Sequence, residues 1–137
     1  MKSLLDDVRA FHVACDIPIL PAPTEPVAER VTLRIDLIEE EVNKELLPAM
    51  RSGGDLPSIA DAMADAIYVI AGAALEYGIP LDRVWNAVQA ANMAKVDPAT
   101  GKVLRRHDGK VLKPPGWTPP DIATVLRAAA AGGSADG

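Results

Sequence analysis

Apolar side chains recur at helical spacing along most of the chain. Between residues 27 and 50 they stand three or four positions apart, which is the spacing of one face of an amphipathic helix. Shorter segments at 3–15, 58–77 and 80–96 repeat the pattern. Two long helices joined by a short loop pack antiparallel. We therefore predict an all-α fold, an antiparallel bundle of four to five helices.

Capping and breaking residues predict where these helices begin and end. Ser3 and Ser58 are suited to cap the first and third helices, and Gly78 to end the third. Pro80 suits the first turn of the fourth helix, where a missing amide hydrogen costs nothing. Thr118 is predicted to cap a short last helix, followed by a frayed tail.

Two segments between the helices have a different character. Four prolines between residues 18 and 26 predict an extended connector, because proline breaks regular helix. Residues 97–117 contain the turn signals Thr100-Gly101 and Asp108-Gly109 beside short apolar pairs. This segment also carries many of the basic residues, so we predict a basic loop containing a small hairpin near the C-terminus.

The third and fourth helices are each predicted to bury one apolar stripe. On the third helix the stripe contains Met63, Ile67, Ile70 and Ala74. On the fourth it contains Leu81, Val84, Trp85 and Val88. Both stripes are expected to face the interior of the bundle.

Composition narrows the class of protein. A chain of 137 residues suits one domain, predicted at 1–130 with a flexible tail at 131–137. Hydrophobic residues make up 49% and aromatic residues only 4%, which favours closely packed helices over a sheet. No apolar run is as long as the ~20 residues that a membrane helix needs, so we predict no membrane partner.

Charge and cysteine content limit the partners and the compartment. The formal net charge of -5 argues against a protein that coats nucleic acid. Cys15 is the single cysteine, so no disulfide forms within the chain. The first ten residues carry charges where a signal peptide has its apolar stretch. We expect a cytoplasmic protein.

Acidic residues gather on the two predicted long helices. Glu39, Glu40, Glu41 and Glu45 crowd two turns of one helix, and Asp61 and Asp65 lie one turn apart on the other. Facing carboxylates repel unless a cation lies between them, and oxygen-only ligands select Mg²⁺, Mn²⁺ or Ca²⁺. The alternative is that the glutamates form a solvated face and that Asp61 belongs to a capping box with Ser58.

Polar residues elsewhere suit a phosphate ligand. Asn92 and Lys95 continue the apolar line of the fourth helix, where polar groups are candidates for ligand contact. Five basic residues follow within a short stretch, namely Lys102, Arg105, Arg106, Lys110 and Lys113. A positive loop beside a metal cluster suits polyphosphate. No Walker A loop, Gly-rich dinucleotide turn or Cys/His zinc spacing is present.

The order of these motifs resembles the all-α nucleoside triphosphate pyrophosphohydrolases. The segments are LIEEEV, then IADAMADAIYVI, then ANMAK followed by DGKVLKPPGWTPPDI. Within that superfamily the chain is similar to the MazG-like and phosphoribosyl-ATP pyrophosphohydrolase-like group, which includes dNTP-cleaving members. The resemblance covers roughly residues 4–127.

The resemblance implies a set of metal ligands, with two departures. In the family, Glu-Glu-x-x-Glu and Glu-x-x-Asp motifs on antiparallel helices bind Mg²⁺, but here Lys44 and Ala62 replace one glutamate in each motif. Glu45 and Asp61 lie one residue from those gaps, and residues four apart still share a helix face. The implied ligands are Glu41, Glu45, Asp61 and Asp65, with Glu40 as the catalytic base.

The family mechanism implied is Mg²⁺-dependent attack of water on the α-phosphorus, with Mn²⁺ able to substitute. The products are a nucleoside monophosphate and pyrophosphate. The residues that this mechanism would use for substrate binding are Asn92, Lys95, Arg106, Lys110 and Lys113, with Phe11, His12 and Trp85 as candidates to contact the base.

Substrate and assembly follow from the resemblance as expectations. A dNTP is expected, of the dGTP/dATP or dUTP class. One alternative is a phosphoribosyl-ATP pyrophosphohydrolase of histidine synthesis. The other is a helical interaction module whose acidic face binds a protein and not a metal. Family members form homodimers or dimers of dimers, so we expect the same here.

Overall fold

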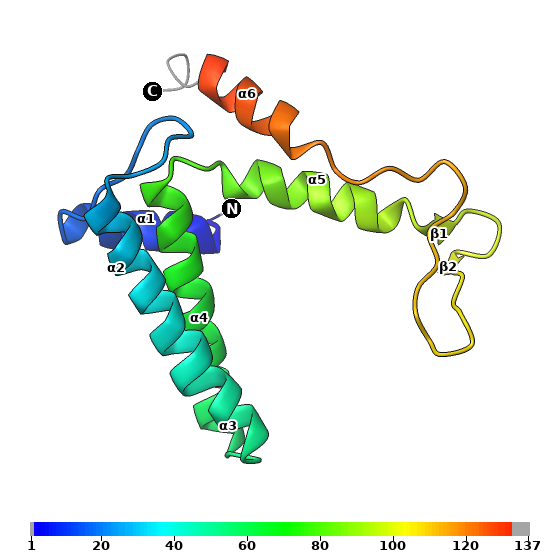
Figure 1. The fold of residues 1–137 in the computed structure, drawn as a ribbon, viewed down its shortest axis with the longest axis horizontal. Helices are drawn as coiled ribbons and strands as arrows, with labels where there is room; N and C mark the ends of the chain where they lie inside the picture. The colour runs from blue at the N-terminus through cyan, green and yellow to red at the C-terminus, as the bar shows by residue number, and fades with distance from the viewer. Residues whose placement is uncertain (1, 133–137) are drawn as a thin grey trace.

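The computed structural model describes residues 2–132 and is mostly helical, which confirms the all-α prediction. The elements in chain order are α1 (Leu4–Ala14), α2 (Ala28–Ile38), the π-helix η1 (Glu39–Leu46), α3 (Leu47–Arg51), α4 (Leu56–Glu76), α5 (Leu81–Met93), β1 (Val96–Asp97), β2 (Lys102–Val103) and α6 (Ile122–Gly132). Figure 1 shows two arms: α2, η1 and α3 run alongside α4 in one, and α6 runs back along α5 in the other.

The predicted helix at 27–50 is continuous but not uniform. Residues Ile38 and Leu47, which flank η1, both have right-handed helical backbone angles, so the chain passes from α to π and back without a break. The Leu47 amide donates to the Val42 carbonyl five residues earlier, which is the π-helical pattern. A π segment makes room for one extra residue in a helix, and such segments often lie at functional sites.

Gly78 ends α4 as predicted, and its lack of a side chain allows the proline-rich connector to lie close to the end of the helix. Its φ of +64° is left-handed, and a Cβ there would lie 2.1 Å from the Ala22 carbonyl oxygen. The Ile79 amide donates to the Ala74 carbonyl at 2.9 Å, which satisfies a free carbonyl of the last turn. The connector is fixed nearby because the Leu20 amide donates to the Leu75 carbonyl at 3.0 Å.

Some predicted helix ends are confirmed and others are wrong. Ser3 forms a complete capping box with Asp6 at the start of α1. Ser58 does not cap α4, because the helix already begins at Leu56 after Asp55. Thr118 does not cap α6, because the Asp121 carboxylate accepts the Thr124 amide at 3.0 Å just before the helix starts.

A small core lies where α1 crosses the C-terminal half of α4. Val8, Ala71 and Leu75 are buried there, with Leu5 and Ile19 packed against them. Nearer the N-terminal end of α4, the buried residues are alanines such as Ala62 and Ala66. Small side chains allow neighbouring helix backbones to approach closely.

The two predicted apolar stripes are buried only in part. Ala74 on α4 is buried, and Leu81 and Val84 on α5 are partly buried, but the other members are exposed, so the expectation is wrong for them. Met63, Ile67 and Ile70 on α4 are 43%, 53% and 45% exposed. On α5, Trp85 is 69% and Val88 39% exposed. The cause is the open shape: α1 packs on α4 and α6 on α5, while the two arms diverge (Figure 1).

The C-terminal basic loop contains the predicted hairpin. β1 and β2 pair antiparallel in the register Val96↔Val103, and an isolated bridge joins Arg105 to Val111. Gly109, with φ of +87°, provides the left-handed turn between the bridged residues. The loop lies at the far end of α5 (Figure 1).

The expectation that no helix is long and apolar enough to cross a membrane is wrong for α4. Its 21 residues pass that test by length and composition. The core helix of a soluble protein passes the same test, and α4 packs against α1, α2 and η1.

The predicted single domain at 1–130 stays a prediction. The helix α6 extends into the predicted tail as far as Gly132, and residues 133–137 lie outside the described part of the chain.

Candidate metal centre

Three carboxylates meet where η1 faces α4. Each of Glu41, Glu45 and Asp65 offers one oxygen, and these oxygens all lie within 4.8 Å of one another. Glu41 and Asp65 are half-buried, while Glu45 is exposed at the edge of the cluster. The three residues come from two antiparallel elements, so the helix pairing itself assembles the cluster.

The local environment disfavours the charge on Glu41. Burial is the largest cause that raises the pKa of this carboxyl, and the charges of Glu45, Asp65 and Glu40 raise it further. One Glu41 oxygen, Oε2, is buried and has no hydrogen-bond partner among the described residues. A carboxylate held among like charges without a partner is the arrangement that a cation relieves.

The donor set fits a hard divalent ion. All three groups are carboxylates, and oxygen-only ligands suit Mg²⁺, Mn²⁺ or Ca²⁺, whereas Zn²⁺ sites use mainly nitrogen and sulfur. Mg²⁺ keeps several waters and binds few protein carboxylates together with substrate phosphates. Three carboxylates on one open face leave room for both, so Glu41, Glu45 and Asp65 are the residues that would hold the ion.

On η1, the acidic residue lies one position later than in the family motif, at Glu45 instead of position 44, and the backbone of η1 compensates for this displacement. Glu45 is four residues after Glu41, and the hydrogen bond that spans five residues at the end of η1 shows that this segment takes up one residue more than a regular α-helix would. This places Glu45 on the same side as Glu41, beside Asp65. The resemblance had implied that Glu45 takes over from position 44, and the geometry brings Glu45 into the cluster.

On α4, the acidic residue lies one position earlier than in the family motif, at Asp61 instead of position 62, and the helix does not compensate for this displacement. The regular α-helix buries Ala62 at 5% exposure and leaves Asp61 exposed, outside the group that Glu41, Glu45 and Asp65 form. Adjacent residues on an α-helix differ by about 100° in direction, so Asp61 does not share the direction of the gap at Ala62. The structure therefore brings together three of the four predicted ligands.

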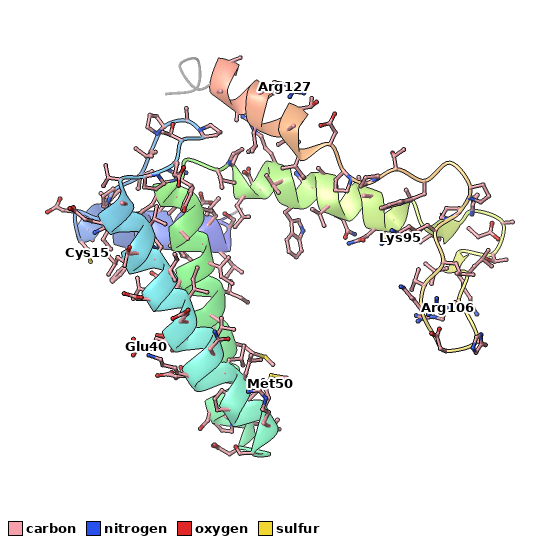
Figure 2. The ribbon with its side chains drawn as sticks, viewed as in Figure 1. Cys15, Glu40, Met50, Lys95, Arg106 and Arg127 are labelled. Carbon is pink, nitrogen blue, oxygen red and sulfur yellow. The ribbon has the colours of Figure 1, made fainter. Side chains whose placement is uncertain are left out.

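Glu40 lies beside the cluster and not within it. Its side chain is exposed on the arm formed by α2, η1 and α3, where Figure 2 labels it. Its charge is close enough to contribute to the raised pKa of Glu41. An exposed carboxylate next to a metal cluster can receive a proton from a water held there.

A second charged cluster, between α2 and α4, pairs one buried carboxylate with two guanidinium groups of the same chain. The Glu76 carboxylate, 1% exposed, accepts from Arg30 Nε at 2.7 Å and pairs with Arg34 Nη1 at 3.1 Å. Arg34 Nη2 also donates to the Val69 carbonyl at 2.9 Å. The sequence pattern did not predict this cluster; the one signal was a glutamate at the end of the apolar second half of α4.

His12 belongs to that buried cluster. It is 2% exposed, and a Cβ added at Gly72 would lie 2.9 Å from its Nε2 and 2.2 Å from Arg34 Nη2. Burial is the main cause that lowers the pKa of His12, and Arg34 lowers it further. The structure thus places His12 in the interior, where it has no open path to a nucleobase, and we leave it out of the proposed site.

The other two base candidates are exposed on different helices. Phe11 on α1 makes an edge-to-face contact with Tyr68 on α4, with ring centroids 5.8 Å apart. Trp85 stands out from α5. Neither prediction is tested by these positions, and both side chains remain available to a ligand.

The basic residues gather at the far end of the α5 arm, apart from the acidic cluster of the same chain. Figure 2 shows Lys95 and Arg106 there and Glu40 on the other arm. Lys95 Nζ donates to Asn92 Oδ1 at 3.2 Å. Arg106 is paired with Asp108 inside the hairpin, while Lys110 is exposed. One chain therefore does not bring the predicted phosphate contacts to the predicted metal.

Comparison with known proteins identifies the family of the chain. A family model described as phosphoribosyl-ATP pyrophosphohydrolase matches residues 8–92, which is more than half of the chain. The matched region begins within α1, contains all of η1 and α4 with the three clustered carboxylates, and ends at Asn92. No curated protein matches the chain.

Proposed function

Because the chain belongs to the phosphoribosyl-ATP pyrophosphohydrolase family, whose members are hydrolases acting on acid anhydrides, we propose that it cleaves a nucleoside triphosphate between the α and β phosphates. The cluster of Glu41, Glu45 and Asp65 around the unpartnered Glu41 oxygen carries this proposal. We propose Mg²⁺ as the ion, with Mn²⁺ able to substitute, a dNTP as the substrate and the cytoplasm as the compartment.

The residues divide the chemistry among them. When bound, the divalent ion supplies charge neutralisation and lowers the pKa of a water. Glu41, Glu45 and Asp65 fix its place, and the exposed Glu40 accepts the proton of the attacking water. A bond forms between the water oxygen and the α-phosphorus. The bond from that phosphorus to the bridging oxygen breaks, and pyrophosphate leaves.

We also propose that the working form is a homodimer or a dimer of dimers. The exposed line of Met63, Ile67 and Ile70 runs along the same helix as Asp65, and contiguous apolar surface of this kind marks an interface. A second copy laid against this face would cover it. Its α5 arm could then bring Asn92, Lys95 and the basic loop to the acidic cluster, which one chain alone does not do (Figure 2).

A substrate screen tests the activity. Purified protein with Mg²⁺ is given each dNTP, each NTP and phosphoribosyl-ATP, and the release of pyrophosphate is scored against inorganic phosphate. The proposal expects pyrophosphate from at least one dNTP. Turnover of phosphoribosyl-ATP alone would replace the dNTP assignment with the histidine-synthesis reaction, and no pyrophosphate from any substrate would leave the interaction module.

Mixing two inactive variants tests the shared site. Asp65→Asn removes the acidic half and Lys95→Met the basic half, so a mixture of exchanged subunits regains activity if each site takes one half from each copy. Light scattering on the same samples reports the oligomeric state. A monomer with full activity would contradict the dimer proposal, and a mixture that stays inactive would contradict the sharing of the site.

A further inference from the structure

Trp117 is fixed against the end of α5 by hydrogen bonds at both its backbone and its side chain. Its indole Nε1 donates to the Ala91 carbonyl at 2.7 Å. That carbonyl is among the last four of α5, which lack partners within a helix. Its backbone amide donates to the Pro114 carbonyl at 3.1 Å, in a turn that contains Gly116 at φ of +79°. The ring therefore has a defined position at the base of the basic loop.

Two lysines from different segments share this ring. Lys95 Nζ, just after α5, lies 5.1 Å from the ring centroid, and Lys113 Nζ, from the loop, lies 4.8 Å from it. The ring quadrupole attracts each ammonium group. Within residues 2–132, neither lysine forms a salt bridge with a carboxylate. Two like charges thus lie beside one aromatic side chain, each about 5 Å from its centroid.

The chemistry of this group selects a phosphate ligand. The chain as a whole carries a net charge of -5, so two unneutralised ammonium groups at one place are a local positive centre. A compact ammonium binds phosphate oxygens as a point charge.

We propose that Trp117 is a positioning residue that holds Lys95 and Lys113 as a pair, and that this pair binds the two phosphates that leave as pyrophosphate. Each ammonium group takes one phosphate of the pyrophosphate. The Asn92 amide, which accepts from Lys95, sets the direction of that lysine. This inference rests on the proposed function for its ligand, although binding of inorganic pyrophosphate does not require turnover.

The test measures pyrophosphate binding to the full chain with EDTA present, so that the acidic cluster holds no divalent ion. Calorimetry gives the affinity. The chain has two tryptophans, so two indole N–H signals appear in a ¹⁵N spectrum, and the signal lost in Trp117→Phe belongs to Trp117. We expect pyrophosphate to shift that signal and to leave the Trp85 signal in place.

Substitutions separate positioning from folding. Trp117→Leu removes the aromatic face and is expected to weaken pyrophosphate binding about tenfold, while Trp117→Phe keeps the face, loses the bond to Ala91 and retains most of the affinity. Lys95→Met and Lys113→Met each weaken binding. In the variant that lacks both lysines, Trp117→Leu is expected to cost nothing more, because its effect passes through them.

Several results would overturn the inference. One is that wild-type protein does not bind pyrophosphate in EDTA. Another is that Trp117→Phe and Trp117→Leu lose affinity equally while both lower the melting temperature, which would make the role structural. If pyrophosphate binds as expected but no nucleotide is hydrolysed, the inference stands and the proposed function fails.

Discussion

The helix pair formed by α2, η1 and α4 holds two charged clusters that are built in opposite ways. Near the C-terminal end of α4, Glu76 is fully buried and pairs with Arg30 and Arg34 of the same chain. Near its middle, Asp65 meets two glutamates, and no cation of the described chain lies among them. The buried carboxylate of Glu76 already has cationic partners within the chain, whereas three adjacent carboxylates repel one another unless a cation lies between them.

This difference indicates that the Glu76 cluster stabilises the fold, and it supports the proposed role of the acidic cluster in binding a cation. Glu76 stabilises the junction of α2 with α4, where His12 and Gly72 leave no spare room. The acidic cluster costs stability in the absence of an ion, because each carboxylate disfavours its neighbours. Substitutions in the two clusters should therefore change different measurements, and the predictions below use that contrast.

Removal of the charge on Glu76 should have the largest effect on folding. Glu76→Gln leaves Arg34 buried without its partner, and breaking a buried pair in this way costs about 3–5 kcal/mol. We expect the free energy of unfolding, measured with urea, to fall by that order. The matched control is Asp7→Asn, which removes an exposed pair with Lys2 and should cost less than about 1 kcal/mol. Equal effects of the two changes would contradict the contrast.

Asp65→Asn should lower activity strongly and leave stability nearly unchanged, the opposite of Glu76→Gln. It keeps the shape of the side chain and removes one charge from the acidic cluster, so we expect turnover to fall by more than about 100-fold, since even residues that only orient metal ligands are worth about 10- to 100-fold. Stability without metal should stay equal or rise. Glu39→Gln, an exposed residue of η1 outside the cluster, is the control for activity. Activity retained in Asp65→Asn would refute the metal centre.

Glu45 and Asp61 form a matched pair that tests the two one-residue offsets. Glu45 lies in the cluster and Asp61 does not, so Glu45→Gln should weaken Mg²⁺ affinity about tenfold or more and Asp61→Asn should change it little. Calorimetric titration with Mg²⁺ or Mn²⁺ measures both. Similar losses in the two variants would return Asp61 to the ligand set that the resemblance implies.

Deletion of Asn43 tests the role of the π-helical segment. The deletion removes the extra residue of η1, so the helix can become regular and still place the glutamate of position 45, now three residues after Glu41, on the same face. We expect metal affinity within a few-fold of wild type. Asn43→Ala, which keeps the chain length, is the control. Loss of metal binding in the deletion alone would show that the π geometry itself is required.

The smallest expected effect is the pH dependence of the metal-free protein. The pKa of Glu41 is raised in the folded state, so the folded chain binds the proton more tightly than the unfolded chain does. This contribution to stability is present below the unfolded pKa, near the usual glutamate value, and is lost as pH rises through the folded pKa. Glu41→Gln should therefore raise the melting temperature by a few degrees at neutral pH and by less near pH 5.

The same Glu41 carboxyl should make metal affinity rise with pH, whereas its contribution to the stability of the metal-free protein falls with pH. Protons and Mg²⁺ compete for Glu41, so metal affinity should rise with pH through the raised pKa. Thermal melts with and without Mg²⁺ across this range measure both trends on one sample. A metal-induced stabilisation that does not depend on pH between about 5 and 7 would contradict the role of Glu41 as a ligand.

The sequence by itself determined the helical class, the two long helices and the residue types of the metal centre. Apolar periodicity and the caps at Ser3 and Gly78 are local signals, and acidic residues one turn apart on a helix lie on one face whatever the rest of the chain does. The starts of two helices are predicted wrongly from the sequence. Asp55 and Asp121 precede α4 and α6, where Ser58 and Thr118 are the predicted caps.

Only the tertiary structure decided which of these residues act together. The cluster includes Glu45 and not Asp61, although each lies one turn from another acidic residue of the cluster, because membership also depends on the local helix type and on what the facing helix presents. Burial of His12 against Arg34, and the meeting of Lys95 with Lys113 on Trp117, join segments far apart in the sequence. Contacts of this kind depend on how the helices pack, which periodicity does not encode.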